Sequence, residues 1–212
     1  MTELYFGATD DFDVPEFERR KVIDEIRMVM SALDCVLPDD AGIYCSSDIT
    51  TGKRYYFDFL LPYGATSDED LKQKLGPARH KEMKTELIQK NVDRGREFTE
   101  KLRERGLVNL VNPGPFFARG FDQQHYLYLW EWVIIKKIYE VYFNEDWEYS
   151  NGCTLEFAIA TKKGIPRLDH HGAPLDPAEA AAMIERAVTN LKKHGFPVDK
   201  LELNLSRLRE PF

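Results

Sequence analysis

Hydrophobic positions recur every three to four residues in three long stretches of the chain, residues 14–33, 78–105 and 123–137. They include Phe17, Val22, Ile26, Met30 and Leu33 in the first, Met83, Leu87, Val92, Phe98 and Leu102 in the second, and Tyr126, Leu129, Trp130, Val133 and Ile134 in the third. This spacing places apolar side chains on one face of a helix. The pattern therefore predicts three amphipathic helices.

Shorter apolar runs predict strands. Residues 42–50 and 54–61 are joined by Thr51-Gly52-Lys53, whose length and glycine are typical of a β-hairpin turn. Residues 107–111 and 138–143 give two further strands, and another follows Pro166. Two prolines in residues 112–115 prevent regular strand pairing there and predict a loop.

Two more helices complete the pattern, over residues 154–163 and 177–194. Asp176 and Glu179 form a capping-box pattern around Pro177, and Gly195 ends the second helix. Alternating strands and helices predict a flavodoxin- or Rossmann-like α/β fold, in which a mostly parallel sheet has helices on both faces. Ligands usually bind such sheets beyond the carboxyl ends of the strands, so a site is expected just after Phe59, Val111 and Phe143.

The length of 212 residues and the hydrophobic fraction of 43 % suffice for one sizeable core. We predict an N-terminal extension over residues 1–53, made of a helix and a hairpin strand, packed on an α/β domain of residues 54–212. The net charge of −7 disfavours binding to nucleic acid or to an anionic membrane. No stretch approaches the roughly 20 apolar residues of a membrane span. Scattered cysteines without a secretory signal indicate the cytoplasm.

The segment from Trp147 to Glu156 is the best candidate active site. It follows a predicted strand, and Gly152 permits a tight turn and close approach of a ligand. Glu156 is expected in the first turn of the next helix, where the helix dipole favours an ionised carboxylate that can act as a nucleophile. Alternatively, Glu156 only complements the helix dipole, as first-turn glutamates commonly do.

Around this segment the chain resembles the nucleoside 2-deoxyribosyltransferase-like family, which includes deoxyribosyltransferases and nucleotide N-glycosidases. The resemblance is specific over residues 143–166. It rests on Trp147, Ser150, Gly152, Glu156, Ala158, Ala160, Gly164, Ile165 and Pro166, in that order. Two features depart from the family pattern: Ser150 stands where several active members have Asp, and about 50 residues precede the run that begins at Tyr55.

The resemblance implies that Glu156 attacks the anomeric carbon of a nucleoside or nucleotide, so that the base leaves and a glycosyl-enzyme forms. Ser150, Asn151 and Gly152 would shape the sugar pocket. No cofactor is expected. A homo-oligomer is expected because family members assemble with their sites near subunit contacts, and because the aromatic face of residues 123–135 exceeds what one domain normally covers.

Other residues have both a functional and a structural interpretation. Asp58 lies in an apolar run, so it either assists Glu156 or pairs with a buried cation. The loop aromatics that could stack on a nucleobase, or simply pack, are Tyr63, Phe116, Phe117 and Trp147. Cys153 could be a thiolate near a helix start, or a packed thiol. His170 and His171 are adjacent, with no third ligand at a recognised spacing, so no metal site is predicted.

Three functions thus remain open. The leading one is cleavage or transfer of a nucleoside or nucleotide N-glycosidic bond by Glu156, assisted by Asp58. A non-catalytic nucleotide-binding or sensor domain on the same fold is the alternative, because a fold does not determine chemistry. The third is a structural or interaction protein that uses the N-terminal helix and the acidic arm before it.

Overall fold

The computed structural model describes residues 16–209 and contains a four-stranded, all-parallel sheet in the order β2-β1-β3-β4. Its strands are β1 (Gly42–Ser46), β2 (Leu110–Val111), β3 (Ile138–Phe143) and β4 (Arg167–Asp169). Tyr44 of β1 pairs with Val111 of β2 and Val141 of β3. The predicted parallel sheet is confirmed.

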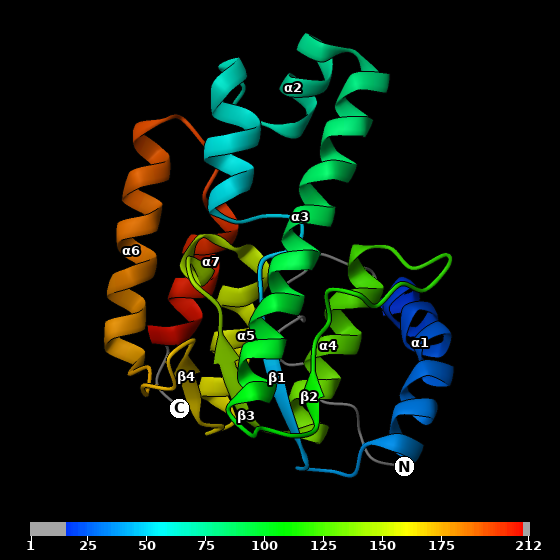
Figure 1. Ribbon diagram of the computed structural model, residues 1–212. Coiled ribbons are helices and arrows are strands. Elements are labelled where there is room, and N and C mark those ends of the chain that lie inside the picture. The colour runs from blue at the N-terminus through cyan, green and yellow to red at the C-terminus, as the bar shows by residue number, and fades with distance from the viewer. Residues whose placement is uncertain (1–15, 210–212) are drawn as a thin grey trace.

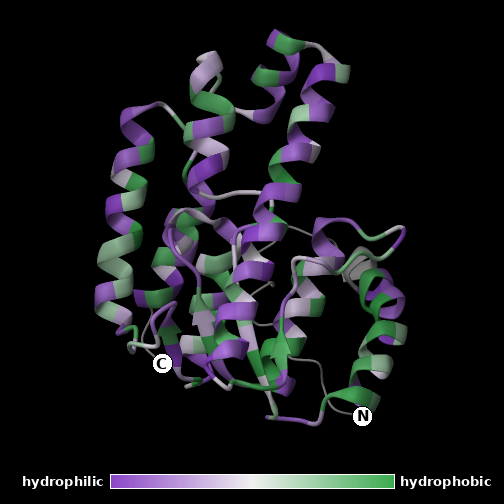
Figure 2. Ribbon diagram, viewed as in Figure 1, coloured by the Kyte–Doolittle hydropathy of each residue, from purple (hydrophilic) through white to green (hydrophobic). Residues whose placement is uncertain are grey.

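Helices cover both faces of the sheet, as predicted (Figure 1). On one face, helix α3 (Pro77–Glu104) packs Phe98 and Leu102 against Ile43, Cys45 and Tyr142. The other face, with Tyr44 and Phe143, joins a larger core that includes α4 (Gln123–Lys137) and α5 (Asn151–Lys162). Hydrophobic and hydrophilic residues alternate along α3 and α6 (Pro177–Lys193), as in helices with one buried face (Figure 2).

Helix α1 (Glu16–Val36) packs on α4 and confirms the first predicted helix, apart from residues 14 and 15, which lie outside the described residues. Its Ile26 is fully buried, and Glu25 accepts a hydrogen bond from Nε2 of His125 at 2.5 Å. The rings of Phe116 and Phe121 contact Tyr126 on another side of α4. The aromatic helix is therefore covered by its own chain, and the oligomer prediction keeps only the family resemblance as its basis.

The predicted strand over residues 54–61 is wrong, and with it the hairpin. Residues Tyr55–Leu60 form a π-helical turn, η1, followed by the 3-10 turn η2 (Leu61–Tyr63). The buried residues of this turn are Tyr56, Phe59 and Leu60. Positions three and four residues apart lie on the same face of a helix, whereas a strand would bury alternate positions. A continuous apolar run does not distinguish a buried strand from a buried helix, and here the helix formed.

The turn η1, helix α2 (Asp68–Leu75) and the first half of α3 stand beyond the carboxyl edge of the sheet (Figure 1). The ring of Tyr56 contacts Phe196, which follows α6, at 5.2 Å between centroids, so this helical layer shares the main core. Helix α7 (Asp199–Arg209) packs against α5. Within residues 16–209, no helix is long and apolar enough to cross a membrane.

The strand β1 lies in the interior of the sheet, between β2 and β3. It comes from the part of the chain that we predicted to be an N-terminal extension. Residues 42–46 are thus part of the sheet, although the predicted extension included them.

Candidate functional site

Glu156 lies in the second turn of α5, not the first. The helix begins at Asn151 and is capped by Ser150, three residues before the predicted start at Thr154. Glu156 is therefore the sixth helical residue. The influence of the helix dipole is largest within the first turn, so complementing the dipole does not account for this carboxylate.

Both carboxylate oxygens of Glu156 accept hydrogen bonds from β1. The Tyr44 hydroxyl donates to Oε1 at 2.8 Å, and the Ser46 hydroxyl donates to Oε2 at 2.6 Å. Tyr44 and Ser46 point to the same face because they are two residues apart on a strand. Neither is exposed to solvent, whereas Glu156 is partly buried. The strand thus fixes the orientation of one carboxyl group at the carboxyl edge of the sheet.

The Glu156 carboxyl group titrates near neutral pH. Burial raises its pKa to about 7, and the hydrogen bonds from Ser46 and Tyr44 oppose this effect. Burial and the neighbouring Glu156 charge raise the pKa of Tyr44 well above its ordinary value, so Tyr44 stays a hydrogen-bond donor. At neutral pH the site therefore interconverts readily between a carboxylic acid and a carboxylate.

Removal of the Ser46 hydroxyl is expected to raise the pKa of Glu156, because one donor that stabilises the carboxylate disappears. The loss of one hydrogen bond to a charged group corresponds to a pKa change of about 1. The pKa of Glu156 should therefore rise by about 1 in Ser46→Ala. The pKa can be measured by ¹³C NMR on protein labelled at glutamate side-chain carboxyls, with the Glu156 signal identified by its loss in Glu156→Gln. Ser206→Ala, which removes a hydroxyl that bonds to the Leu203 carbonyl, is the control. An unchanged pKa in Ser46→Ala would contradict the observed contact.

Polar contacts join the loops that follow β1 and β3. Asp48 is 2 % exposed and accepts a hydrogen bond from Nη1 of Arg94 at 3.3 Å. Arg94 also donates to the Glu145 carbonyl at 3.0 Å, and Asn144 Nδ2 donates to the Ser47 hydroxyl at 3.2 Å. Burial raises the pKa of Asp48, while the charge of Arg94 lowers it. These contacts hold the two loops beside the Glu156 site.

Aromatic rings continue from Tyr44 toward the surface. The Trp130 ring lies 6.2 Å from that of Tyr44, and Phe116 lies 5.4 Å from Trp130, both edge to face. Phe116 and Trp130 are partly buried. Phe116, one of the predicted base-stacking residues, is thus connected to the site through Trp130. Phe117 is 82 % exposed and belongs to none of these ring contacts.

Three predicted site residues lie elsewhere. Trp147 is 3 % exposed and stacks on Phe157 at 4.8 Å, so it is a core residue without a free face for a base. Asp58 is exposed on η1, and Tyr63 is 40 % exposed on η2. The expectation for Asp58 assumed a strand end, and the helical turn removes that reason for placing it beside Glu156.

The residues at the start of α5 have structural roles. The Ser150 hydroxyl accepts a hydrogen bond from the Cys153 backbone N–H at 3.4 Å, and Thr51 Oγ1 accepts from the Asn151 N–H at 3.2 Å. A Cβ atom at Gly152 would come no closer than 3.9 Å to Ser150 Oγ, so the local packing admits alanine. The tight turn expected at Gly152 is not present, because the residue is helical.

Cys153 is 1 % exposed, and burial raises the pKa of its thiol well above the ordinary value. It therefore remains a thiol, which is a poor nucleophile.

His170, one of the two adjacent histidines, lies 3.4 Å from the Glu145 carboxylate. Across residues 16–209, no group of three or more His, Cys, Asp or Glu side chains is arranged to hold a metal ion.

The sequence interpretation missed Tyr44, Ser46, Asp48 and Arg94. The available signal was the pair of hydroxyl groups at alternate positions of a buried strand, on Tyr44 and Ser46, since buried polar groups require partners.

Comparisons of the chain with protein-family models, curated proteins and solved structures found no match.

Proposed function

We propose that the protein cleaves or transfers the N-glycosidic bond of a nucleoside or nucleotide, with Glu156 as the nucleophile. The observation that supports this most is the Glu156 carboxylate, held by Tyr44 and Ser46 through both oxygens at the carboxyl edge of a parallel sheet. Bound ligands commonly occupy this edge in such folds. The resemblance over residues 143–166 supplies the reaction class.

The reaction divides into two displacements at the anomeric carbon. First, one oxygen of the Glu156 carboxylate forms an ester bond to C1′ as the C1′–N bond breaks, and the base leaves with the bonding electrons and takes a proton from water. Next, water or a second base attacks C1′ and releases Glu156 as a carboxylate. Each carboxylate oxygen retains a lone pair beyond the one that accepts from Tyr44 or Ser46, so neither donor blocks the attack.

The hydroxyl groups of Tyr44 and Ser46 orient the carboxylate and reduce its freedom to rotate. A fixed orientation lowers the entropy cost of reaching the attacking geometry. Burial destabilises the ionised carboxylate, because it is poorly solvated. The carboxylate is therefore more reactive toward a cationic sugar centre. Geometry and burial therefore act in the same direction on the proposed reaction.

The test uses a panel of ribonucleosides, 2′-deoxynucleosides and their 5′-monophosphates. Chromatography measures the free base that the protein releases from each. Because the carboxylate attacks and its pKa is about 7, kcat/KM is expected to rise about ten-fold from pH 6 to pH 8 and then to level off.

Release that falls over this pH range would contradict a carboxylate nucleophile. Stabilisation of the fold by a nucleotide, without base release at any pH, would instead support the non-catalytic nucleotide-binding alternative. No response to any member of the panel would count against both.

A further inference from the structure

The amino end of α5 is closed to anions by protein hydroxyl groups. Backbone N–H groups at a helix start are the usual binding site for a phosphate. Here the Asn151 N–H donates to Thr51 Oγ1 at 3.2 Å, and the Cys153 N–H donates to Ser150 Oγ at 3.4 Å. A phosphate at this position would have to displace two protein acceptors.

The cations near this edge already face carboxylates. Arg94 contacts Asp48 at 3.3 Å, Glu145 at 3.5 Å and Asp146 at 3.8 Å through its guanidinium nitrogens. Lys53 Nζ lies 2.9 Å from Asp146. The charge of Arg54 acts on Asp48. A phosphate would therefore compete with existing ion pairs for Arg94 and for Lys53.

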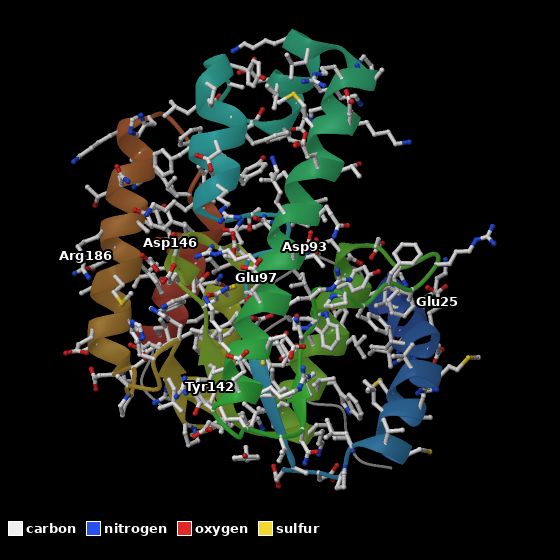
Figure 3. The ribbon with its side chains drawn as sticks, viewed as in Figure 1. Glu25, Asp93, Glu97, Tyr142, Asp146 and Arg186 are labelled. Atoms are coloured by element: carbon white, nitrogen blue, oxygen red, sulfur yellow. The ribbon has the colours of Figure 1, made fainter. Side chains whose placement is uncertain are left out.

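Carboxylates outnumber cations in the loops that frame the site. Together with Arg94 and Glu156, residues 47–54 and 144–150 carry Asp48, Glu145, Asp146, Glu148 and Glu156 against Lys53, Arg54 and Arg94. Figure 3 shows Asp146 in the loop after β3, and Asp93 and Glu97 on α3 near Gly95, which lies against Ser47. Asp93 is paired with Arg96 at 3.0 Å. The field around the site disfavours a second anion.

We infer that the site takes unphosphorylated nucleosides and discriminates against nucleoside 5′-phosphates. The inference rests on the proposed function and narrows its substrate class. Near this helix start, a dianionic phosphate loses its hydration and must displace the protein acceptors of Asn151 and Cys153, or the carboxylate partners of Arg94 and Lys53. A neutral nucleoside carries no charge for these carboxylates to repel, so it does not meet this cost.

The experiment compares each nucleoside with its own 5′-monophosphate at pH 8 and low ionic strength. We expect kcat/KM to be at least about ten-fold lower for the monophosphate. A second measurement does not need turnover: calorimetric titration of Glu156→Gln should show tighter binding of the nucleoside than of its monophosphate.

Asp146→Asn tests the electrostatic cause. Asp146 has a positive φ of 63°, a conformation that asparagine also adopts readily, so the backbone should be preserved. The change removes one carboxylate and frees Lys53. It should raise kcat/KM for the monophosphate about five-fold and leave that for the nucleoside within about two-fold. Asp24→Asn, at an exposed ion pair with Arg27 on α1, removes the same charge and should change neither.

The outcomes separate the two proposals. Equal or faster reaction of the monophosphate overturns the nucleoside preference and leaves the proposed reaction standing. Base release from no compound overturns the proposed reaction, and the titrations then decide the preference: tighter nucleoside binding supports it, and tighter monophosphate binding overturns it. An equal effect of Asp146→Asn and Asp24→Asn would contradict the assigned role of the loop charges.

Discussion

At pH 8, Glu156→Gln is expected to be catalytically inert and more stable than the wild-type protein. The variant keeps the shape of the side chain but removes the proposed nucleophile, so turnover should fall by several orders of magnitude. Burial raises the pKa of Glu156 from its ordinary 4.5 to about 7. The ionised group thus destabilises the folded state above that pH, and the neutral amide avoids a cost on the order of 1 to 3 kcal/mol.

The sign of the stability effect follows from the direction of the pKa change. The folded protein binds the Glu156 proton more tightly than the unfolded chain, so stability from this group is fully present below about pH 4.5 and is lost as pH rises through 7. The advantage of the Gln variant should therefore shrink toward pH 5, as urea denaturation at several pH values can measure.

Glu179→Gln is the matched control, because Glu179 is an exposed first-turn glutamate of α6. Its charge complements the helix dipole, so its removal should cost a few tenths of a kcal/mol at pH 8 and leave turnover unchanged. A Glu156→Gln variant that is folded and still releases base at the wild-type rate would remove Glu156 from the mechanism.

The second large effect is expected at Gly52, where alanine should reduce the free energy of unfolding by about 2 to 4 kcal/mol. Gly52 has a φ of 148°, and a Cβ atom there would lie 2.5 Å from Oδ2 and 2.7 Å from Cβ of Asp48. Asp48 is buried and bound to Arg94, so it has little room to move. The substitution therefore combines an unfavourable backbone conformation with a steric clash.

Gly64→Ala separates these two causes. Gly64 also has a positive φ, of 58°, but no heavy atom lies within 4 Å of the position of its Cβ. Alanine there should cost only about 1 kcal/mol, from backbone strain. Urea denaturation of both variants gives the comparison, and equal losses would show that the Asp48 contact is not tight.

The sequence predicted the elements whose hydrophobic periodicity was long or whose ends carried clear signals. Residues 123–137 and 138–143 were predicted as a helix followed directly by a strand, and the structure has the same bounds. The run over residues 54–61 failed because it is apolar nearly throughout and has no clear period. Its helical form depends on which residues reach the core, and Phe196, which packs against Tyr56, is far away in the chain.

The candidate site was predictable only where its residues are neighbours in sequence. Glu156 was found from the local pattern of residues 147–156. Its two partners lie 112 and 110 residues earlier, on a strand that was assigned to an extension. Trp147 had both a base-stacking and a packing interpretation in the sequence, because a loop tryptophan can be accessible or buried. Only the fold shows Phe157 stacked on its ring.

The alternation of Tyr44 and Ser46 along β1 also bears on how the sheet aligns during folding. All five residues of β1 are buried, so burial alone distinguishes the two faces of this strand weakly. A slip by one residue would place Ile43 and Cys45 opposite Glu156 and leave its carboxylate without donors in an apolar setting. The pair of hydroxyl groups thus penalises the misaligned sheet, and the residues proposed for catalysis also select the correct strand register.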